Sequence, residues 1–171
     1  GPRSQAIRPT SERLRESVFD ILAHRFGDPV ENANVIDLFA GGGALGLEAL
    51  SRGAARALFV DDGAEARALL RANIEALGLG GVTRIFRRDA TKLGAAPPNE
   101  QFSLAFLDPP YGKDLAASAL LALVDGGWLA PGAIVVVEES AKAHIDLPPA
   151  LQREDERRYG DTQFVFARYI G

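Results

Sequence analysis

Short apolar runs alternate with longer amphipathic segments along this chain, and that alternation constrains its fold more than any other feature. The apolar runs have the length and composition of buried strands, and they cover residues 34–40, 56–62, 82–90, 102–108 and 133–140. The intervening segments with helical spacing cover residues 44–53, 64–80 and 115–127. Such alternation is typical of an α/β domain with a mostly parallel sheet and helices on both faces. In the second of these helices we expect Leu69, Leu70, Ile74 and Leu77 to face the sheet.

The two ends of the chain carry patterns of their own. The stretch "RPTSERLRESVFDILAHRF" (8–26) predicts a helix with Thr10 or Ser11 as its N-terminal cap. The tail "LQREDERRYGDTQFVFARYI" (151–170) has two alternating runs around the turn signal "YGDT", which predicts an antiparallel hairpin. With this hairpin the sheet has seven strands and ends in an antiparallel edge.

The composition limits the classes of protein and site that this chain can form. Its 171 residues suit one domain, and 47% hydrophobic with 25% charged residues is a globular composition. No apolar stretch approaches the roughly 20 residues of a membrane span, so we expect a cytoplasmic protein without a membrane partner. Cysteine is absent, and His24 and His144 have no ligand spacing, so we expect no metal site. The formal net charge of −4 argues against a surface devoted to phosphate.

The first strand runs into a glycine-rich loop, "DLFAGGGALGLEAL". Gly41, Gly43 and Gly46 satisfy the G-x-G-x-x-G spacing between a strand and a helix. Glycines allow a sharp turn and let a ligand approach the backbone, and the helix start beyond them offers free N–H groups. The pattern predicts a bound ligand at this loop; a tight turn without a ligand is the alternative.

Acidic residues lie at or near the carboxyl ends of three of the predicted strands, and they limit which ligand the loop can bind. Asp37 stands four residues before Gly41, where a carboxylate repels a diphosphate but can hold a cationic amino group. Asp61 ends the second strand, where a carboxylate can accept hydrogen bonds from both ribose hydroxyls. Asp89 lies at the end of the third strand and can take an adenine amino group, although an aspartate there is more often a helix cap. S-adenosylmethionine has the amino group and no phosphate, so it suits these acids better than NAD does.

The stretch "DPPYG" follows the fourth strand, which is expected beside the first. Asp108 offers a carboxylate and Pro109 a main-chain carbonyl, and Pro110 stiffens the direction of that carbonyl. Two such acceptors orient the lone pair of a planar exocyclic amine and stabilise the positive charge that develops on it. Tyr111 offers a ring on which a base can stack. A stiff turn with a packed tyrosine is the alternative interpretation.

Together, the segments "RPTSERLRESVFDIL", "DLFAGGGALGLEALSRGA" and "DPPYG" resemble the bacterial RsmD family. Members of that family are S-adenosylmethionine-dependent methyltransferases that modify the N2 amine of one guanine in 16S ribosomal RNA. The resemblance implies a Rossmann-like methyltransferase domain over 31–171, preceded by an N-terminal arm and helix over 1–30. It also implies S-adenosyl-L-methionine as cofactor and S-adenosyl-L-homocysteine as product. The implied partner is 16S ribosomal RNA, either naked or within an assembling small subunit, and the implied enzyme is a monomer.

The resemblance assigns site residues as well. The target-base clamp consists of Asp108, Pro109, Pro110 and Tyr111. The cofactor-binding residues are Thr10, Asp37, Gly41, Gly43, Asp61, Asp62, Asp89 and Ala90. Asp62 is included because the family carries a second acid two residues after the ribose acid, where this chain has Gly63. The family also has serine in place of Gly42 and a basic hairpin before "RPT", so we expect the arm to be truncated at its start.

Three other functions are open at this point. The DPPY motif is shared with adenine-N6 methyltransferases that act on DNA or RNA. An NAD-dependent dehydrogenase would have a phosphate-favouring loop and a catalytic His or Lys in the crevice, and the sequence has neither signal. A binding module without catalysis is disfavoured by the intact Asp108.

Overall fold

The structure is a computed structural model that describes residues 11–171. Its strands are β1 (Asn34–Leu38), β2 (Arg56–Val60), β3 (Thr83–Phe86), β4 (Phe102–Leu107), β5 (Leu129–Ser140), β6 (Leu151–Tyr159) and β7 (Thr162–Tyr169). Its helices are α2 (Glu12–Arg25), α3 (Ala44–Ser51), α4 (Ala64–Leu77), the short 3-10 helix η1 (Gly80–Val82) and α5 (Leu115–Asp125).

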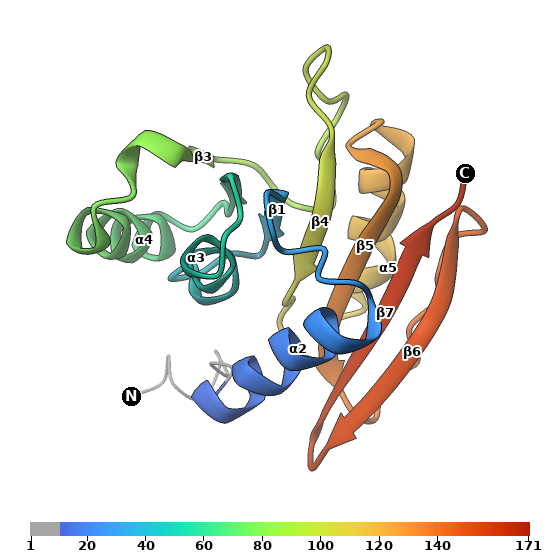
Figure 1. Cartoon of the computed structure of the whole chain (residues 1–171). Helices are drawn as coiled ribbons and strands as arrows, with labels where there is room; N and C mark the ends of the chain where they lie inside the picture. Colours follow the sequence, from blue (N-terminus) through green and yellow to red (C-terminus); the bar gives the residue numbers. More distant parts are fainter. Residues whose placement is uncertain (1–10) are drawn as a thin grey trace.

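The seven strands form one sheet in the order β3-β2-β1-β4-β5-β7-β6 (Figure 1). Strands β1 to β5 run parallel to their neighbours among themselves, whereas β7 is antiparallel to both β5 and β6. The predicted α/β fold with an antiparallel C-terminal hairpin is therefore confirmed. In register, Leu38 lies opposite both Val60 and Leu107, so β1, β2 and β4 end at the same level. The residues that follow these strands consequently meet at one edge of the sheet.

Each face of the sheet has its own hydrophobic core. Val18, Phe19 and Leu22 of α2 pack in one core together with side chains of α3 and α4. Ala119 and Leu120 of α5 pack in the other core. Helices therefore cover both faces, as predicted, with α2, α3 and α4 on one side and α5 on the other (Figure 1).

The inward face of α4 differs from the prediction. Leu69 and Leu77 were expected to face the sheet, but they are 47% and 60% exposed, so this prediction is wrong. The buried stripe of α4 consists of Arg67, Leu70 and Ile74. The helix also ends earlier than predicted, because Gly78 adopts a left-handed conformation (φ 70°) that closes it after Leu77.

Two strands have other bounds than the sequence predicts. β3 is shorter than 82–90, because residues 87–90 leave the sheet and enter a turn. β5 is longer than 133–140, since it begins at Leu129, which pairs with Phe102 before a register shift in the ladder. Trp128, just before this strand, is fully buried and its Nε1 donates to the main-chain oxygen of Gly94 (2.8 Å).

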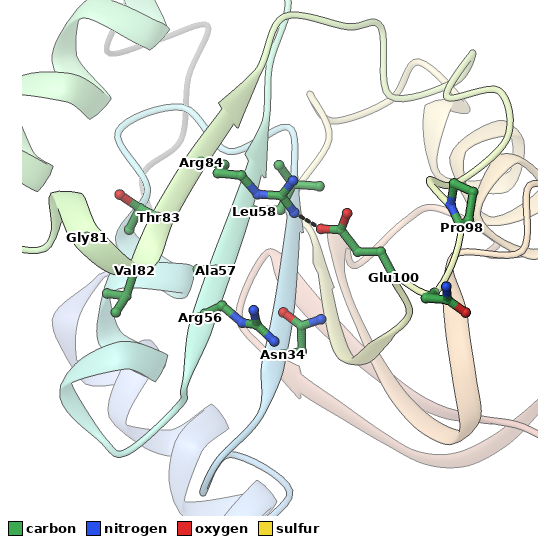
Figure 2. Close-up of a pocket in the computed structure, with 11 residues that line it drawn as sticks. Asn34, Arg56, Ala57, Leu58, Gly81, Val82, Thr83, Arg84, Pro98 and Glu100 are labelled. Carbon is green, nitrogen blue, oxygen red and sulfur yellow. Dashed lines mark ion pairs between the residues drawn. The ribbon is translucent and has the colours of Figure 1, made fainter.

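A hollow of about 440 Å³ lies at the amino-terminal ends of β1, β2 and β3 (Figure 2). Arg84 and Glu100 form an ion pair within it, and Asn34 and Arg56 are part of its lining. None of the predicted site residues lines this hollow. Ligands of open α/β sheets bind beyond the carboxyl ends of the strands, which is the opposite edge.

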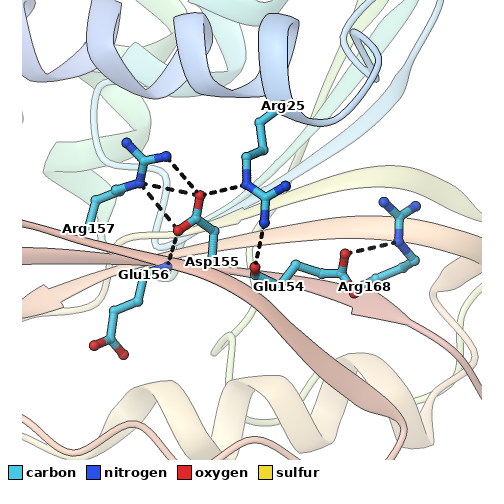
Figure 3. A network of polar contacts seen from close by, with 6 residues as sticks. All are labelled: Arg25, Glu154, Asp155, Glu156, Arg157 and Arg168. Carbon is cyan, nitrogen blue, oxygen red and sulfur yellow. Dashed lines mark hydrogen bonds and ion pairs between the residues drawn. The ribbon is translucent and has the colours of Figure 1, made fainter.

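Helix α2 is capped at one end and tied to the hairpin at the other. The side chain of Ser11 accepts a hydrogen bond from Leu14 N (3.1 Å), so Ser11 is the cap. Arg25 Nε donates to Asp155 Oδ2 (3.1 Å), and Arg157 donates to the same carboxylate (2.9 Å; Figure 3). The hydrogen bond from Arg157, helped by that from Arg25, lowers the pKa of Asp155 to about 2. Within residues 11–171, no helix has the length and apolar character that crossing a bilayer requires.

Candidate active site

The glycine loop between β1 and α3 turns through three residues with positive φ. These are Phe39 (56°), Gly41 (55°) and Gly43 (84°). A Cβ on Gly43 would lie 2.4 Å from Leu70 Cδ1, so this glycine is required by the packing of the loop against α4. A Cβ on Gly41 would meet nothing within 4 Å. Gly41 therefore has a conformation that favours glycine and open space beside its backbone, as a ligand-binding loop needs.

Asp61 joins this loop to the loop that follows β2. Its Oδ2 accepts a hydrogen bond from Gly41 N (2.9 Å), and its Oδ1 accepts one from Gly63 N (2.8 Å). The adjacent Asp62 is exposed. The two acids thus differ in surroundings: Asp61 orders two loops, and Asp62 faces solvent.

A pocket of about 230 Å³ lies beyond the ends of β2 and β3. Five predicted site residues line it: Asp61, Asp62, Asp89, Ala90 and Pro110. The structure therefore brings the acids predicted for ribose and adenine together with one member of the DPPY motif. Of the other predicted residues, Asp37, Gly41, Gly43, Asp108, Pro109 and Tyr111 lie outside this lining, and Thr10 lies outside the residues that the structure describes.

The side chain of Asp89 is held by hydrogen bonds at the start of a turn. Its Oδ1 accepts hydrogen bonds from Thr91 N (2.8 Å) and Thr91 Oγ1 (2.7 Å). These bonds, that of the Thr91 side chain first, lower the pKa of the Asp89 carboxyl. Asp89 therefore caps a turn rather than a helix, and an ionised carboxylate faces the pocket. Its contact with adenine stays a prediction.

Asp37 lies beneath the glycine loop. Its side chain is buried, with 2% exposed, and its Oδ2 accepts a hydrogen bond from Gly46 N (3.0 Å) in α3. Burial raises the pKa of Asp37 to about 8, against the effect of the Gly46 hydrogen bond and with a smaller contribution from the charge of Asp61. The predicted contact of Asp37 with an amino group stays a prediction.

The DPPY motif begins at the residue that follows β4. The N–H of Asp108 donates to the main-chain oxygen of Leu38 (3.4 Å), which continues the ladder with β1. Burial raises the pKa of the Asp108 carboxyl well above its ordinary value, and the charges of Glu138, Asp37 and Glu139 raise it further. Acids at the ends of β1, β4 and β5 therefore lie close enough to influence one another.

Comparison with known sequences decides the family. The family described as "Conserved hypothetical protein 95" matches residues 1–168. Ribosomal RNA small subunit methyltransferase D of Escherichia coli (strain K12) is 36% identical over 150 residues, which are 87% of this chain and 72% of that protein. The chain belongs to the RsmD family. The protein of the same name from Haemophilus influenzae is 31% identical over 137 residues, covering 79% of this chain and 69% of that protein.

Solved structures agree with this membership. The Escherichia coli protein yhhF superposes with a TM-score of 0.81 at 30% identity, over 96% of this chain and 88% of that chain. An RNA methyltransferase from Salinibacter ruber, solved in complex with S-adenosyl-L-homocysteine, superposes with a TM-score of 0.67 at 14% identity, over 95% and 94%. The second likeness shows the fold alone. This RsmD-family chain is thus a methyltransferase with a Rossmann-like fold.

The hydroxyl of Tyr111 has hydrogen-bond partners that the sequence did not indicate. It donates to Glu138 Oε2 (3.1 Å) and lies 2.7 Å from Thr162 Oγ1. Burial, which is the largest cause, raises the pKa of Tyr111, and the charge of Glu138 adds to it. A signal for Glu138 exists, because it follows the apolar run "AIVVV" just as Asp108 follows "FSLAFL".

Arg88 is a second residue that the sequence reasoning missed. It lines the pocket beside Asp89. Its Nη1 donates to the main-chain oxygen of Leu93 (2.9 Å), and its guanidinium lies 4.8 Å from the centre of the Phe86 ring. These contacts hold the positively charged side chain of Arg88 in the lining of the pocket. Among residues 11–171 no group of three or more His, Cys, Asp or Glu side chains is placed to hold a metal ion.

Proposed function

We propose that this chain transfers a methyl group from S-adenosylmethionine to the exocyclic N2 amine of a guanine in 16S ribosomal RNA. The observation that carries the proposal is the position of Pro110, which lines the same pocket as Asp61 and Asp89. A motif whose acceptors suit an aromatic amine thus adjoins a pocket whose acids suit an adenosine group. The similar proteins from Escherichia coli and Haemophilus influenzae, which are named as small-subunit ribosomal RNA methyltransferases, support the substrate class.

The donors and acceptors around the pocket fit the cofactor. Because Asp61, Asp62, Asp89 and Ala90 line one pocket, we assign the first two to the ribose hydroxyls and the last two to the adenine. Asp37 and the open side of Gly41 are assigned to the amino-acid end. When bound, the cofactor supplies an electrophilic methyl group. The glycine loop and the Asp61 bridge hold these groups in place before any ligand binds, which limits the entropy lost on binding.

The clamp prepares the amine for attack. Asp108 accepts one N–H of the amine and the main-chain carbonyl of Pro109 accepts the other, so the nitrogen lone pair is directed away from the ring plane. The positive charge that develops on the nitrogen is stabilised by these acceptors. A raised pKa makes Asp108 a more basic acceptor than an ordinary aspartate, and the same carboxylate is near for the proton that the amine loses.

The substitution Asp108→Asn tests the clamp. It keeps the size of the side chain but replaces one acceptor oxygen by a donor. We expect single-turnover methylation of the RNA to slow by roughly 10²–10³, by analogy with the loss of an oxyanion-hole donor. Affinity for S-adenosylhomocysteine should stay within about three-fold, because Asp108 is assigned to the target amine and not to the cofactor. The matched control is Asp114→Asn, an exposed aspartate at the start of α5.

Two measurements decide the substrate and the cofactor. Mass spectrometry of nucleosides from ribosomal RNA, with and without the gene, should show the loss of one N2-methylguanosine; loss of an N6-methyladenosine would overturn the guanine assignment. Calorimetry should detect binding of S-adenosylhomocysteine and much weaker binding of NAD, and tighter binding of NAD would refute the proposal as a whole.

A further inference from the structure

The hydroxyl of Tyr111 is held by two side chains that come from the C-terminal part of the chain. It donates to Glu138 Oε2 (3.1 Å), and the 2.7 Å contact with Thr162 Oγ1 is then completed by the threonine hydroxyl as donor. Glu138 lies near the end of β5 and Thr162 begins β7. Glu138 is 2% exposed and Thr162 is 4% exposed. These two partners therefore hold the hydroxyl end of the Tyr111 side chain in place.

A second bond ties the same loop to β5. The N–H of Gly112 donates to Glu139 Oε1 (3.4 Å), and the same oxygen accepts a hydrogen bond from Ser140 N (2.6 Å). Neighbouring residues of a strand point to opposite faces, so Glu138 and Glu139 hold the loop from both sides of the sheet. The loop that carries the clamp is thus fastened to the strand next to β4 and to the hairpin beyond it.

We propose that Glu138 and Thr162 are positioning residues for methyl transfer, which fix the ring of Tyr111 by its hydroxyl so that a ring face is set for the target base. This inference rests on the function that we propose for the site. It makes the C-terminal hairpin a part of the base-binding site.

The physical reason is the orientation of the ring. A tyrosine in a surface loop can rotate about two side-chain bonds, and a base that stacks on it must first select one orientation. Two partners at the hydroxyl restrict that orientation. A displacement of about 1 Å at such a site can cost on the order of 10²-fold in rate, so a small gain in order has a measurable effect.

A double-mutant cycle tests whether Thr162 acts through Tyr111. Tyr111→Phe and Thr162→Val each remove one hydroxyl and keep the shape of the side chain. We expect each to lower kcat/KM for RNA by roughly ten-fold, and the double variant to lower it by about the same factor rather than by about 100-fold. KM for the cofactor should be unchanged. Thr83→Val is the matched control, since Thr83 donates its hydroxyl to Leu79 O at the far edge of the sheet.

The same logic applies to Glu138. Glu138→Gln keeps an acceptor oxygen for the Tyr111 hydroxyl and should retain most of the activity, whereas Glu138→Ala should fall by roughly ten-fold or more. Equal losses of activity in Glu138→Ala and Glu138→Gln would exclude a role of Glu138 as the hydrogen-bond acceptor of Tyr111. Multiplicative losses in the cycle of Thr162 with Tyr111 would equally overturn the proposal.

A spectroscopic readout is independent of catalysis. The chain has three tyrosines, so the phenol carbon signal of Tyr111 can be assigned in a labelled protein by its loss in Tyr111→Phe. Glu138→Gln and Thr162→Val each alter a partner of the Tyr111 hydroxyl, so each should shift this carbon signal at pH 7. An unchanged signal in both variants would refute the contacts.

The two proposals fail in different ways. If Asp108→Asn methylates RNA normally, the function assigned to the clamp is wrong, whatever the tyrosine signals show. If Asp108→Asn is inactive while Tyr111→Phe is fully active, the function stands and the positioning role of Glu138 and Thr162 is wrong.

Discussion

Replacing Asp37 by asparagine should stabilise the protein at neutral pH and weaken its hold on the cofactor. Asp37 is 2% exposed, and burial raises its pKa from 3.8 to about 8. The folded chain therefore keeps a proton on this carboxyl at pH values where the unfolded chain has released it. Because the folded state binds more protons in this range, the free energy of unfolding must fall as the pH rises from about 4 to about 8.

The magnitude follows from the pKa difference. At roughly 1.4 kcal/mol per pKa unit, a change from 3.8 to about 8 corresponds to about 6 kcal/mol over the whole range and to about 4 kcal/mol by pH 7. An asparagine has no charge to bury, and its Oδ1 can still accept the hydrogen bond from Gly46 N. Relaxation around a buried charge reduces the cost, so we expect a gain of about 2–4 kcal/mol at pH 7.

Urea unfolding at pH 4, 5.5, 7 and 8.5 measures this effect, with Asp20→Asn on the exposed face of α2 as the control. The wild-type chain should lose stability across the series and Asp37→Asn should lose less, so that the two curves meet near pH 4. Calorimetry should show that Asp37→Asn binds S-adenosylhomocysteine roughly 10- to 150-fold more weakly, the value of a lost charged hydrogen bond. Parallel stability curves would refute the burial argument, and unchanged affinity would refute the contact with the amino group.

Four further substitutions test the loops and the network at α2. Asp61→Ala should lower the free energy of unfolding by about 2–4 kcal/mol, because it removes both loop hydrogen bonds, whereas Asp62→Ala should change it by less than about 0.5 kcal/mol; equal losses in urea would exclude the bridge. Gly42→Ser should be tolerated within about 0.5 kcal/mol in thermal unfolding, since the atom nearest to its Cβ, at 3.1 Å, belongs to the half-exposed Leu69. Asp155→Asn should cost about 1 kcal/mol or less above pH 4; the pKa of Asp155 is lowered to about 2, so acid-unfolding curves of variant and wild type should converge as the pH falls to about 2.

Local patterns were enough to predict the elements that carry the site. The apolar runs were enough to predict the parallel strands. A strand that is buried on both faces is a continuous apolar run, so it lacks the regularly spaced polar residues of an amphipathic helix. The cap of α2 followed from Ser11 and the acid after it. The glycine loop was predictable because positive φ at Gly41 and Gly43 leaves few other residues that fit.

Other features depend on contacts that no local pattern contains. Whether Tyr111 stacks freely or is anchored depends on β7 lying between β5 and β6, an order that the hairpin signal does not fix. The exposure of Leu69 depends on how α4 packs, which its helical spacing does not reveal. The direction of Asp37, toward Gly46 in α3, likewise follows from packing and not from its place before the glycines.

Under the proposed function, the acids at the ends of β1 and β4 would suit this edge of the sheet to a cationic ligand. Asp37 and Asp108 are both raised in pKa by burial, and each is raised further by a neighbouring acid. Like charges in a partly desolvated site are costly, so the free protein keeps part of this group protonated. A positively charged ligand would favour the ionised form of each carboxyl. The target amine needs an ionised Asp108 as its hydrogen-bond acceptor. Under the proposed function, the cofactor would therefore prepare the clamp for the base as well as deliver the methyl group.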